Sequence, residues 1–233
     1  MGHQLAFING ATLKKLRELR SVSPEFLCRR ANIRSDQLLA WERCSDSDYP
    51  TMRQAEKIAK ILLSPLAGLY LDPDNLPREE IPRVVNKRRM QNACSFDDSA
   101  YHLAVCRLAQ IRSDAIEIAA EIGAPVQRFS MSKLKSDCVN AASSIRAWIG
   151  FTSKDQEKTA SSRKLFLALR AKFERHGILV VQFGGIATEE LRGIALYYDK
   201  FPVIGINAND RWPAKTFSLL HELVHLSRGD STW

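Results

Sequence analysis

The sequence lacks the long apolar segments that place a chain in a membrane. No apolar run approaches the roughly 18 residues of a membrane-spanning helix. The N-terminal stretch MGHQLAFINGATLKK has neither the basic start nor the long apolar core of a secretion signal. We therefore expect a cytoplasmic protein with no membrane partner.

The sequence has few cysteines, and their spacing does not indicate pairs. The five cysteines form no C-x-x-C pair, and their number is odd, which disfavours a disulfide framework. We expect reduced, mostly buried thiols at Cys28, Cys44, Cys94, Cys106 and Cys138.

Internal repeats and low-complexity segments are also absent, and the positive charge is not concentrated anywhere. The net charge of +8 is spread along the chain rather than gathered in a basic arm. Such a distribution permits contact with nucleic acid without requiring it.

Short helices are predicted throughout residues 12–72. A helix over 12–20 begins with Thr12 as its cap, and a second over 23–33 has Ser23 as cap and Pro24 at its first position. Further helices are predicted at 34–43, 51–62 and 64–71, and the fourth of these five has a clean apolar face.

A stretch rich in proline and charge, residues 73–98, then reads as a linker. Three longer helices are predicted after it, over 99–122, 132–150 and 160–177, each followed or closed by a glycine: Gly123, Gly150 and Gly177.

The pattern changes after the last of these glycines. Residues 178–183, 192–199 and 201–207 are rich in β-branched and aromatic side chains and are bounded by Gly, Pro and Asn, which predicts strands. The last two are close enough for a hairpin. A final helix begins near Trp212 and Pro213.

This final helix contains the stretch FSLLHELVHLSRG, residues 217–229, with the order His-Glu-x-x-His. Positions i and i+4 share one helix face, so His221 and His225 can hold a single zinc ion. Glu222 can accept a proton from water without being a ligand, as the general base of a metallopeptidase. We expect an apolar face made of Phe217, Leu220, Leu223 and Val224.

A third ligand is not evident from the spacing. Arg228 and Ser231 occupy the Gly and last-ligand positions of the pattern H-E-x-x-H-x-x-G-x-x-H/D, which therefore does not match. Asp230, His102 and His176 stay open as alternatives. Tyr197 or Tyr198 can face the cleft, but strand alternation turns only one of them inward.

Residues from about 143 to the end resemble the ImmA/IrrE family of zinc metallopeptidases associated with helix-turn-helix domains. The resemblance is carried by the stretches IRAWIG, LALRAKFERHGILVVQ, LRGIALYYDKFPVIGIN and, most specifically, KTFSLLHELVHL. It implies a metallopeptidase that cleaves a partner repressor, with His221 and His225 as zinc ligands and Glu222 as catalytic base.

The family supplies its third ligand from an acidic residue in a later segment of the form E-x-x-x-N-x-x-A. The sequence ends before such a segment, so we expect a C-terminally truncated chain that holds zinc weakly and has little peptidase activity.

Members also carry a helix-turn-helix domain of the lambda-repressor type, which residues 12–72 resemble. In that arrangement residues 34–43 form the recognition helix, and Arg34, Ser35, Gln37 and Arg43 are the candidate DNA contacts. The base-facing set includes Asp36, Leu39 and Ala40, which suit DNA poorly, so a docking or dimerisation module is an alternative role.

These observations predict a mainly α protein with a small α+β part: a helix-turn-helix domain (1–72), a linker (73–98), a helical connector (99–142) and a partial zincin-like domain (143–233) with a short mixed or antiparallel sheet. The predicted function is a regulatory zinc metallo-endopeptidase acting on a protein substrate such as a repressor. The alternative is a DNA-binding transcription regulator, or a phage or toxin–antitoxin regulator, whose C-terminal domain is non-catalytic. Double-stranded DNA and a second copy of the chain are the further partners considered.

Overall fold

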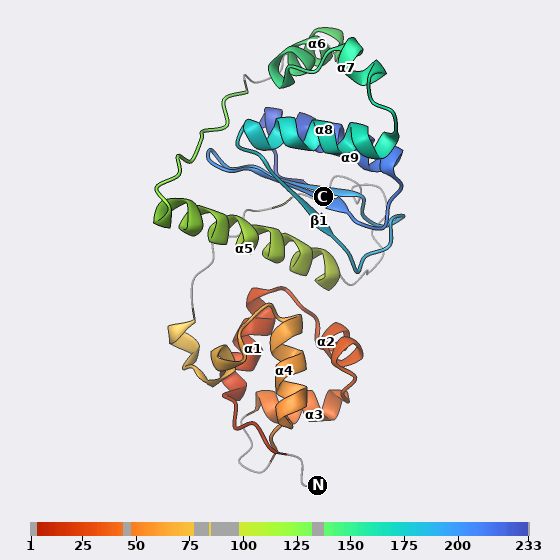
Figure 1. Cartoon of the computed structure of the whole chain (residues 1–233). Coiled ribbons are helices and arrows are strands. Elements are labelled where there is room, and N and C mark those ends of the chain that lie inside the picture. The colour runs from red at the N-terminus through yellow and green to blue at the C-terminus, as the bar shows by residue number, and fades with distance from the viewer. Residues whose placement is uncertain (1–3, 44–47, 77–83, 85–97, 132–137, 233) are drawn as a thin grey trace. The chain divides into compact units, whose positions relative to one another are not determined.

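The computed structural model describes residues 4–43, 48–76, 84, 98–131 and 138–232. Its contacts divide the chain into two compact units (Figure 1). We call residues 1–80 and 94–107 the helical unit, and residues 81–93 and 108–233 the sheet unit. Most of the predicted linker and the start of the helix predicted over 132–150 lie outside the described residues.

The helical unit contains α1 (Gly10–Leu19), α2 (Pro24–Ala31), α3 (Ser35–Glu42), α4 (Met52–Ile61) and two short 3₁₀ turns, Leu66–Tyr70 and Pro73–Asn75. Ser23 caps α2 as predicted, accepting a hydrogen bond from the Phe26 N–H. The predicted cap of α1 is wrong. Asn9 caps that helix through its side chain, while the Thr12 hydroxyl donates to the Leu71 carbonyl.

One apolar core holds these helices together. Each of the helices α1 to α4 contributes at least one fully buried side chain to it: Leu13, Leu27, Leu38 and Ile58, with Leu62 directly after α4. Burying each such side chain contributes about 1.5–3 kcal/mol. The first turns of α5 (Ser99–Glu121) join this unit through Ala100 and Leu103.

The sheet unit is built on three short strands in the order β1-β3-β2. β1 (Leu179–Phe183) runs parallel to β3 (Val203–Asn207), and β2 (Gly193–Leu196) runs antiparallel to it, with Gly193 opposite Ile206. The sheet is therefore mixed, and the three predicted strands and the hairpin between the last two are confirmed.

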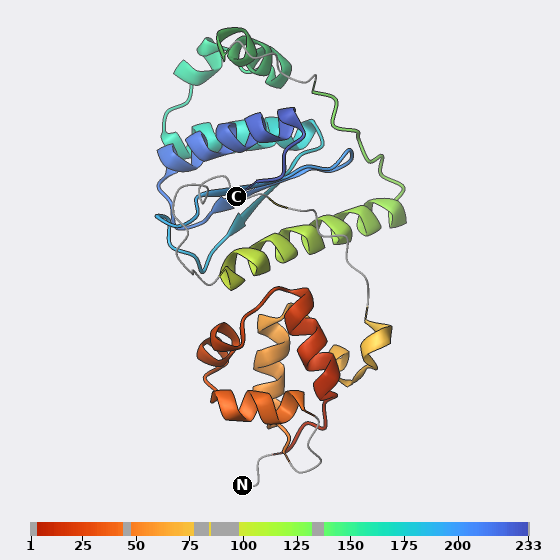
Figure 2. The same ribbon diagram turned by 180° about the vertical axis from the view of Figure 1, so that it is seen from behind.

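Helices cover both faces of this sheet. α8 (Ser162–Arg175) and α9 (Trp212–Arg228) lie side by side over one face, and the part of α5 from Leu108 onward lies along the other (Figures 1 and 2). The helix α6 (Cys138–Ile149) and a short unpredicted helix, α7 (Ser153–Glu157), precede α8. The chain is mainly α with a small α+β part, as predicted.

The face that α9 buries differs from the predicted one. Leu219, Leu223 and Leu226 are fully buried against the sheet, whereas Phe217 is 71% exposed and Leu220 is 37% exposed. The helix has two apolar stripes at helical spacing, and only one of them can face the strands. We call Leu219, Leu223 and Leu226 the buried seam. Of the four residues predicted to form the apolar face, only Leu223 belongs to it.

Glycines end the three preceding helices in the predicted manner. Gly123, Gly150 and Gly177 all have positive φ, a conformation that stops a helix and that glycine adopts without strain. Among the described residues, no helix combines the length and the hydropathy needed to span a bilayer.

Candidate metal and catalytic site

The two histidines of the His-Glu-x-x-His stretch converge on α9. Their Nε2 atoms lie 3.1 Å apart, and the rings meet edge to face with centroids 4.8 Å apart. Two imidazole nitrogens that each bind one tetrahedral zinc ion at 2.0–2.1 Å are separated by about 3.3 Å. The spacing of this pair therefore fits zinc, and both nitrogens belong to a chemical type that zinc prefers.

Glu222 lies on the side of α9 that faces the sheet. It is 6% exposed, and its neighbours on that side are the leucines of the buried seam. A Cβ atom placed on Gly193 would come within 2.5 Å of the Glu222 Oε1 atom. The carboxylate thus occupies the space beside the first residue of β2, next to the helix flank that carries the histidines.

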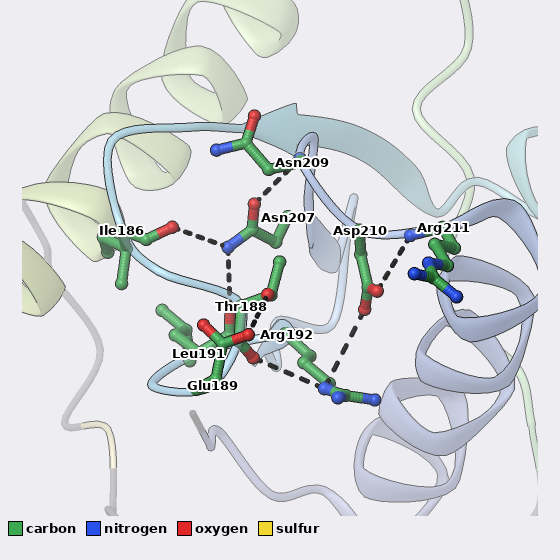
Figure 3. Close-up of polar contacts among 9 residues, drawn as sticks. All are labelled: Ile186, Thr188, Glu189, Leu191, Arg192, Asn207, Asn209, Asp210 and Arg211. Carbon is green, nitrogen blue, oxygen red and sulfur yellow. Dashed lines mark hydrogen bonds and ion pairs between the residues drawn. The ribbon is translucent and has the colours of Figure 1, made fainter.

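A polar network holds the loop that leads into β2 (Figure 3). The buried Asn207 side chain donates from Nδ2 to the carbonyls of Ile186 (3.0 Å) and Leu191 (2.8 Å) and accepts from the Asn209 N–H (3.0 Å). The Asn207 N–H also donates to the Arg192 carbonyl. One residue at the end of β3 therefore fixes the loop immediately before Gly193.

The same network reaches the start of α9. The Arg192 Nε atom donates to the Thr188 carbonyl and lies 3.9 Å from an oxygen of the mostly buried Asp210 carboxylate, which accepts from the Arg211 N–H. Sequence patterns did not identify Asn207, Asp210 or Gly193. Their only local signal is a polar residue or a glycine within a strand or at its end, which by itself does not indicate what it contacts.

The segment after α9 returns to the sheet. Gly229 ends the helix with positive φ, and Ala195 and Thr232 then exchange two backbone hydrogen bonds of 2.9 and 2.8 Å in an antiparallel bridge. The Ser231 hydroxyl accepts from the Tyr197 N–H. Residues 231–232 therefore pair with the edge of β2 that faces away from β3.

The two tyrosines considered for the cleft separate as alternation requires. Tyr197 is on the α9 face, near Gly229, and its hydroxyl donates to Asp199. Burial, followed by this hydrogen bond, raises the pKa of Tyr197. Tyr198 is on the α5 face, with the Arg112 guanidinium 3.6 Å above its ring. Since Tyr197 is about 13 Å along the strand from Gly193, it neighbours the C-terminal end of α9 rather than Glu222.

The described residues supply no third ligand. Within them, no His, Cys, Asp or Glu joins His221 and His225 in a group of three that could hold a metal ion. His176 ends α8 and stacks on Trp148 at 4.0 Å, and His102 belongs to the helical unit. Asp230 follows the Gly229 cap, and its N–H donates to the His225 carbonyl.

Residues 173–232 match the family model of the IrrE N-terminal-like domain, peptidase family M78. The matched segment contains the three strands, α9, the histidine pair and Glu222. The match supports the ImmA/IrrE relationship and a metallopeptidase-like role for this part of the chain, in a family of zinc metallopeptidase type. No curated protein and no solved structure matches the chain significantly.

The four candidate DNA contacts lie at or near α3. Arg34, Ser35 and Arg43 are exposed and Gln37 is half-buried. Arg34 pairs with Asp36 at 3.0 Å on the surface, and the Gln37 Oε1 atom accepts from the Arg34 N–H at the start of the helix. The side-chain oxygen of Gln37 is therefore already engaged in capping α3.

Proposed function

We propose that the protein is a regulatory zinc metallo-endopeptidase that cleaves a partner protein such as a transcriptional repressor. The observation that carries this proposal is the convergence of the His221 and His225 nitrogens beside a buried glutamate, on a helix that packs against a sheet. The family match of residues 173–232 supports it.

His221 and His225 would hold the zinc ion through their Nε2 atoms. A third, acidic ligand is needed to complete the site, and the described residues do not bring one to the pair. A bound zinc ion would act as a Lewis acid that polarises a peptide carbonyl and lowers the pKa of water to about 7.

Glu222 is the proposed general base. Its carboxylate adjoins the histidine flank, so it can take a proton from the attacking water and deliver it to the leaving amine. The edge of β2 can hold an extended peptide through backbone hydrogen bonds, and the position of Glu222 beside the first residue of that strand brings the peptide and the base to the same place.

Zinc titration of the full chain tests the ligands. We expect His221→Ala and His225→Ala each to weaken zinc binding by roughly 100-fold, since each removes one of the two converging nitrogens. His176→Ala is the matched control, because that histidine stacks on Trp148 at the end of α8. Equal affinities in all four proteins would refute the metal site.

The proposed cleavage reaction can be tested by profiling the new protein N-termini that arise in cells expressing the chain. Fragments that appear with the wild-type chain should decrease by about 100-fold or more with Glu222→Gln, which keeps the size of the side chain and removes its basicity. Glu190→Gln, an exposed carboxylate in the loop before β2, should leave the fragments unchanged. An identical fragment pattern with Glu222→Gln would contradict the proposed reaction.

DNA binding by the helical unit is the second candidate function. The observation in its favour is that α2 and α3 are joined by three residues, with Asn32 in the left-handed conformation, and that Arg29, Arg30, Arg34 and Arg43 are exposed around them. In a gel shift, a double Arg34→Gln and Arg43→Gln variant should bind DNA more weakly than wild type, whereas Lys164→Gln should not. Equal shifts would contradict this role for α3.

A further inference from the structure

The Glu222 side chain of α9 packs directly against Gly193 of β2. A Cβ atom on Gly193 would lie 2.5 Å from Oε1, 2.8 Å from Cγ and 2.9 Å from Cδ of Glu222. All three distances are shorter than real nonbonded contacts to a Cβ atom, so any side chain at position 193 would force the Glu222 side chain to move.

The backbone at position 193 does not itself require glycine. Gly193 is not among the described residues with positive φ, and it pairs in register with Ile206 as an ordinary strand residue. Glycine within a strand weakens it and often marks a place where another group approaches closely. The approaching group here is the Glu222 side chain.

A second glycine of the same sheet gives a useful comparison. A Cβ atom on Gly205 would lie 2.5 Å from a methyl carbon of Leu108, on the face that α5 covers. Gly205 therefore accommodates an apolar core contact, whereas Gly193 accommodates an ionisable side chain next to the histidine pair. Gly184, just after β1, has nothing within 4 Å of such an added atom and has no positive φ.

We infer that Gly193 is a positioning residue for Glu222: by having no side chain, it provides the space that keeps the carboxylate between α9 and β2, beside His221 and His225. The catalytic part of this inference rests on the proposed peptidase function. Glutamate has three rotatable side-chain bonds, and confinement of the carboxylate removes rotamers in which it would turn away from the site.

A double-mutant cycle on the full chain tests the contact without any need for activity. Gly193→Ala should reduce the folding equilibrium constant by about tenfold or more when Glu222 is present. In the Glu222→Ala background, which removes Cγ, Cδ and both oxygens, the same change should have an effect of about threefold or less. Urea unfolding of the four proteins measures both.

Additive effects in this cycle would overturn the inference. If Gly193→Ala fails to fold, recovery of folding in the Glu222→Ala background supports the inference and failure in both backgrounds overturns it. Gly184→Ala is the neutral control. Gly205→Ala should be destabilising to the same extent whether or not Glu222 is truncated, because its clash is with Leu108.

Activity measurements test the positioning role. With a substrate identified by N-terminal profiling, Gly193→Ala should lower kcat by about 100-fold while KM and zinc affinity stay near wild type. An unchanged kcat in a folded Gly193→Ala variant that shows coupling would refute the positioning role. If the wild-type chain shows no zinc-dependent cleavage, the proposed peptidase function is refuted, and with it the role of Gly193 in catalysis. The unfolding cycle would still show whether Gly193 and Glu222 are in contact.

Discussion

The helical unit and the sheet unit bury polar side chains in different ways. Among the described residues, the buried polar side chains of the helical unit join segments that are far apart in sequence. Thr12 donates to the Leu71 carbonyl, Arg20 to the Leu62 carbonyl, and the Ser99 hydroxyl accepts from the Ser23 N–H. In the sheet unit, the described buried polar side chains instead all fall within residues 207–232: Asn207, Lys215, Thr216, Ser218, Glu222, Ser227 and Thr232.

This difference is one of distribution: the buried polar groups of the helical unit lie on several elements, whereas those of the sheet unit lie close together in the sequence. Burying a polar group costs free energy unless it is hydrogen-bonded, so such groups are retained where they join elements or where they react. Those of the helical unit fasten α1, α4 and α5. Those of the sheet unit are concentrated on or next to the one helix that carries His221 and His225.

The largest effect is expected in the helical unit, where Arg17 forms two hydrogen bonds to the Glu42 carboxylate at 2.7 and 2.9 Å and both side chains are at most 10% exposed. Glu42→Ala should lower the free energy of unfolding by about 3–5 kcal/mol, because it leaves the buried guanidinium without its partner. Hydrogen exchange should increase in α1 to α4.

Zinc binding in the Glu42→Ala variant should match that of wild type, which would sharpen the contrast between the units. Glu56→Ala, at an exposed position of α4, is the control. If Glu42→Ala weakens zinc binding as well as destabilising α1 to α4, the two sets of polar groups are not independent.

An intermediate effect is expected at Asn207. Asn207→Leu leaves the Ile186 and Leu191 carbonyls without their side-chain donors, which should cost roughly 2–4 kcal/mol. Exchange should increase in residues 186–196, and the fragments produced in cells should decrease because the loop before Gly193 loses its attachment. Asn209→Ala, which keeps the backbone donor to Asn207, should behave as wild type. A loop as protected as before would show that Asn207 does not hold it.

The smallest effect is expected at His102 in the helical unit. Burial lowers the pKa of His102, although nearby Asp98 acts in the opposite direction. A folded-state pKa below the unfolded value means that folding favours the neutral ring. This contribution to stability is therefore present above about pH 6.5 and decreases as the pH falls through that value.

Urea unfolding at pH 7.5 and pH 5.5 measures this dependence. His102→Gln should reduce the loss of stability of the helical unit between the two pH values, and the sheet unit should not respond to the substitution. If the wild-type chain and His102→Gln lose the same stability between pH 7.5 and pH 5.5, His102 does not cause this pH dependence.

Much of the fold could be predicted from local patterns. Ser23 and Pro24 start α2, and glycines stop the long helices. Each of these residues determines a helix end that lies within a few positions of it in the sequence, so the helix ends can be predicted from the sequence alone. The histidine pair is equally local, since residues four apart share a helix face.

What could not be predicted depends on contacts between distant segments. The sequence holds two apolar stripes on α9 and does not indicate which one meets the sheet. The contacts between Gly193 and Glu222 and between Asn207 and the loop at 186–191 depend on strand register and on the packing of α9. The cap of α1 is different, because its signal is local: Asn9 accepts from the Ala11 and Thr12 N–H groups, and the prediction started the helix too late to include it.

The bridge between Ala195 and Thr232 makes the edge of β2 a site of competition. A peptide that adds to this edge must first break the two backbone hydrogen bonds to Thr232, so its apparent affinity includes the equilibrium for release of the chain's own segment. At about 0.5–1.5 kcal/mol for each bond, this release lowers the apparent affinity of every peptide for the edge by the same factor, roughly 5- to 150-fold. The same two bonds make association of this strand edge with other extended chains less favourable.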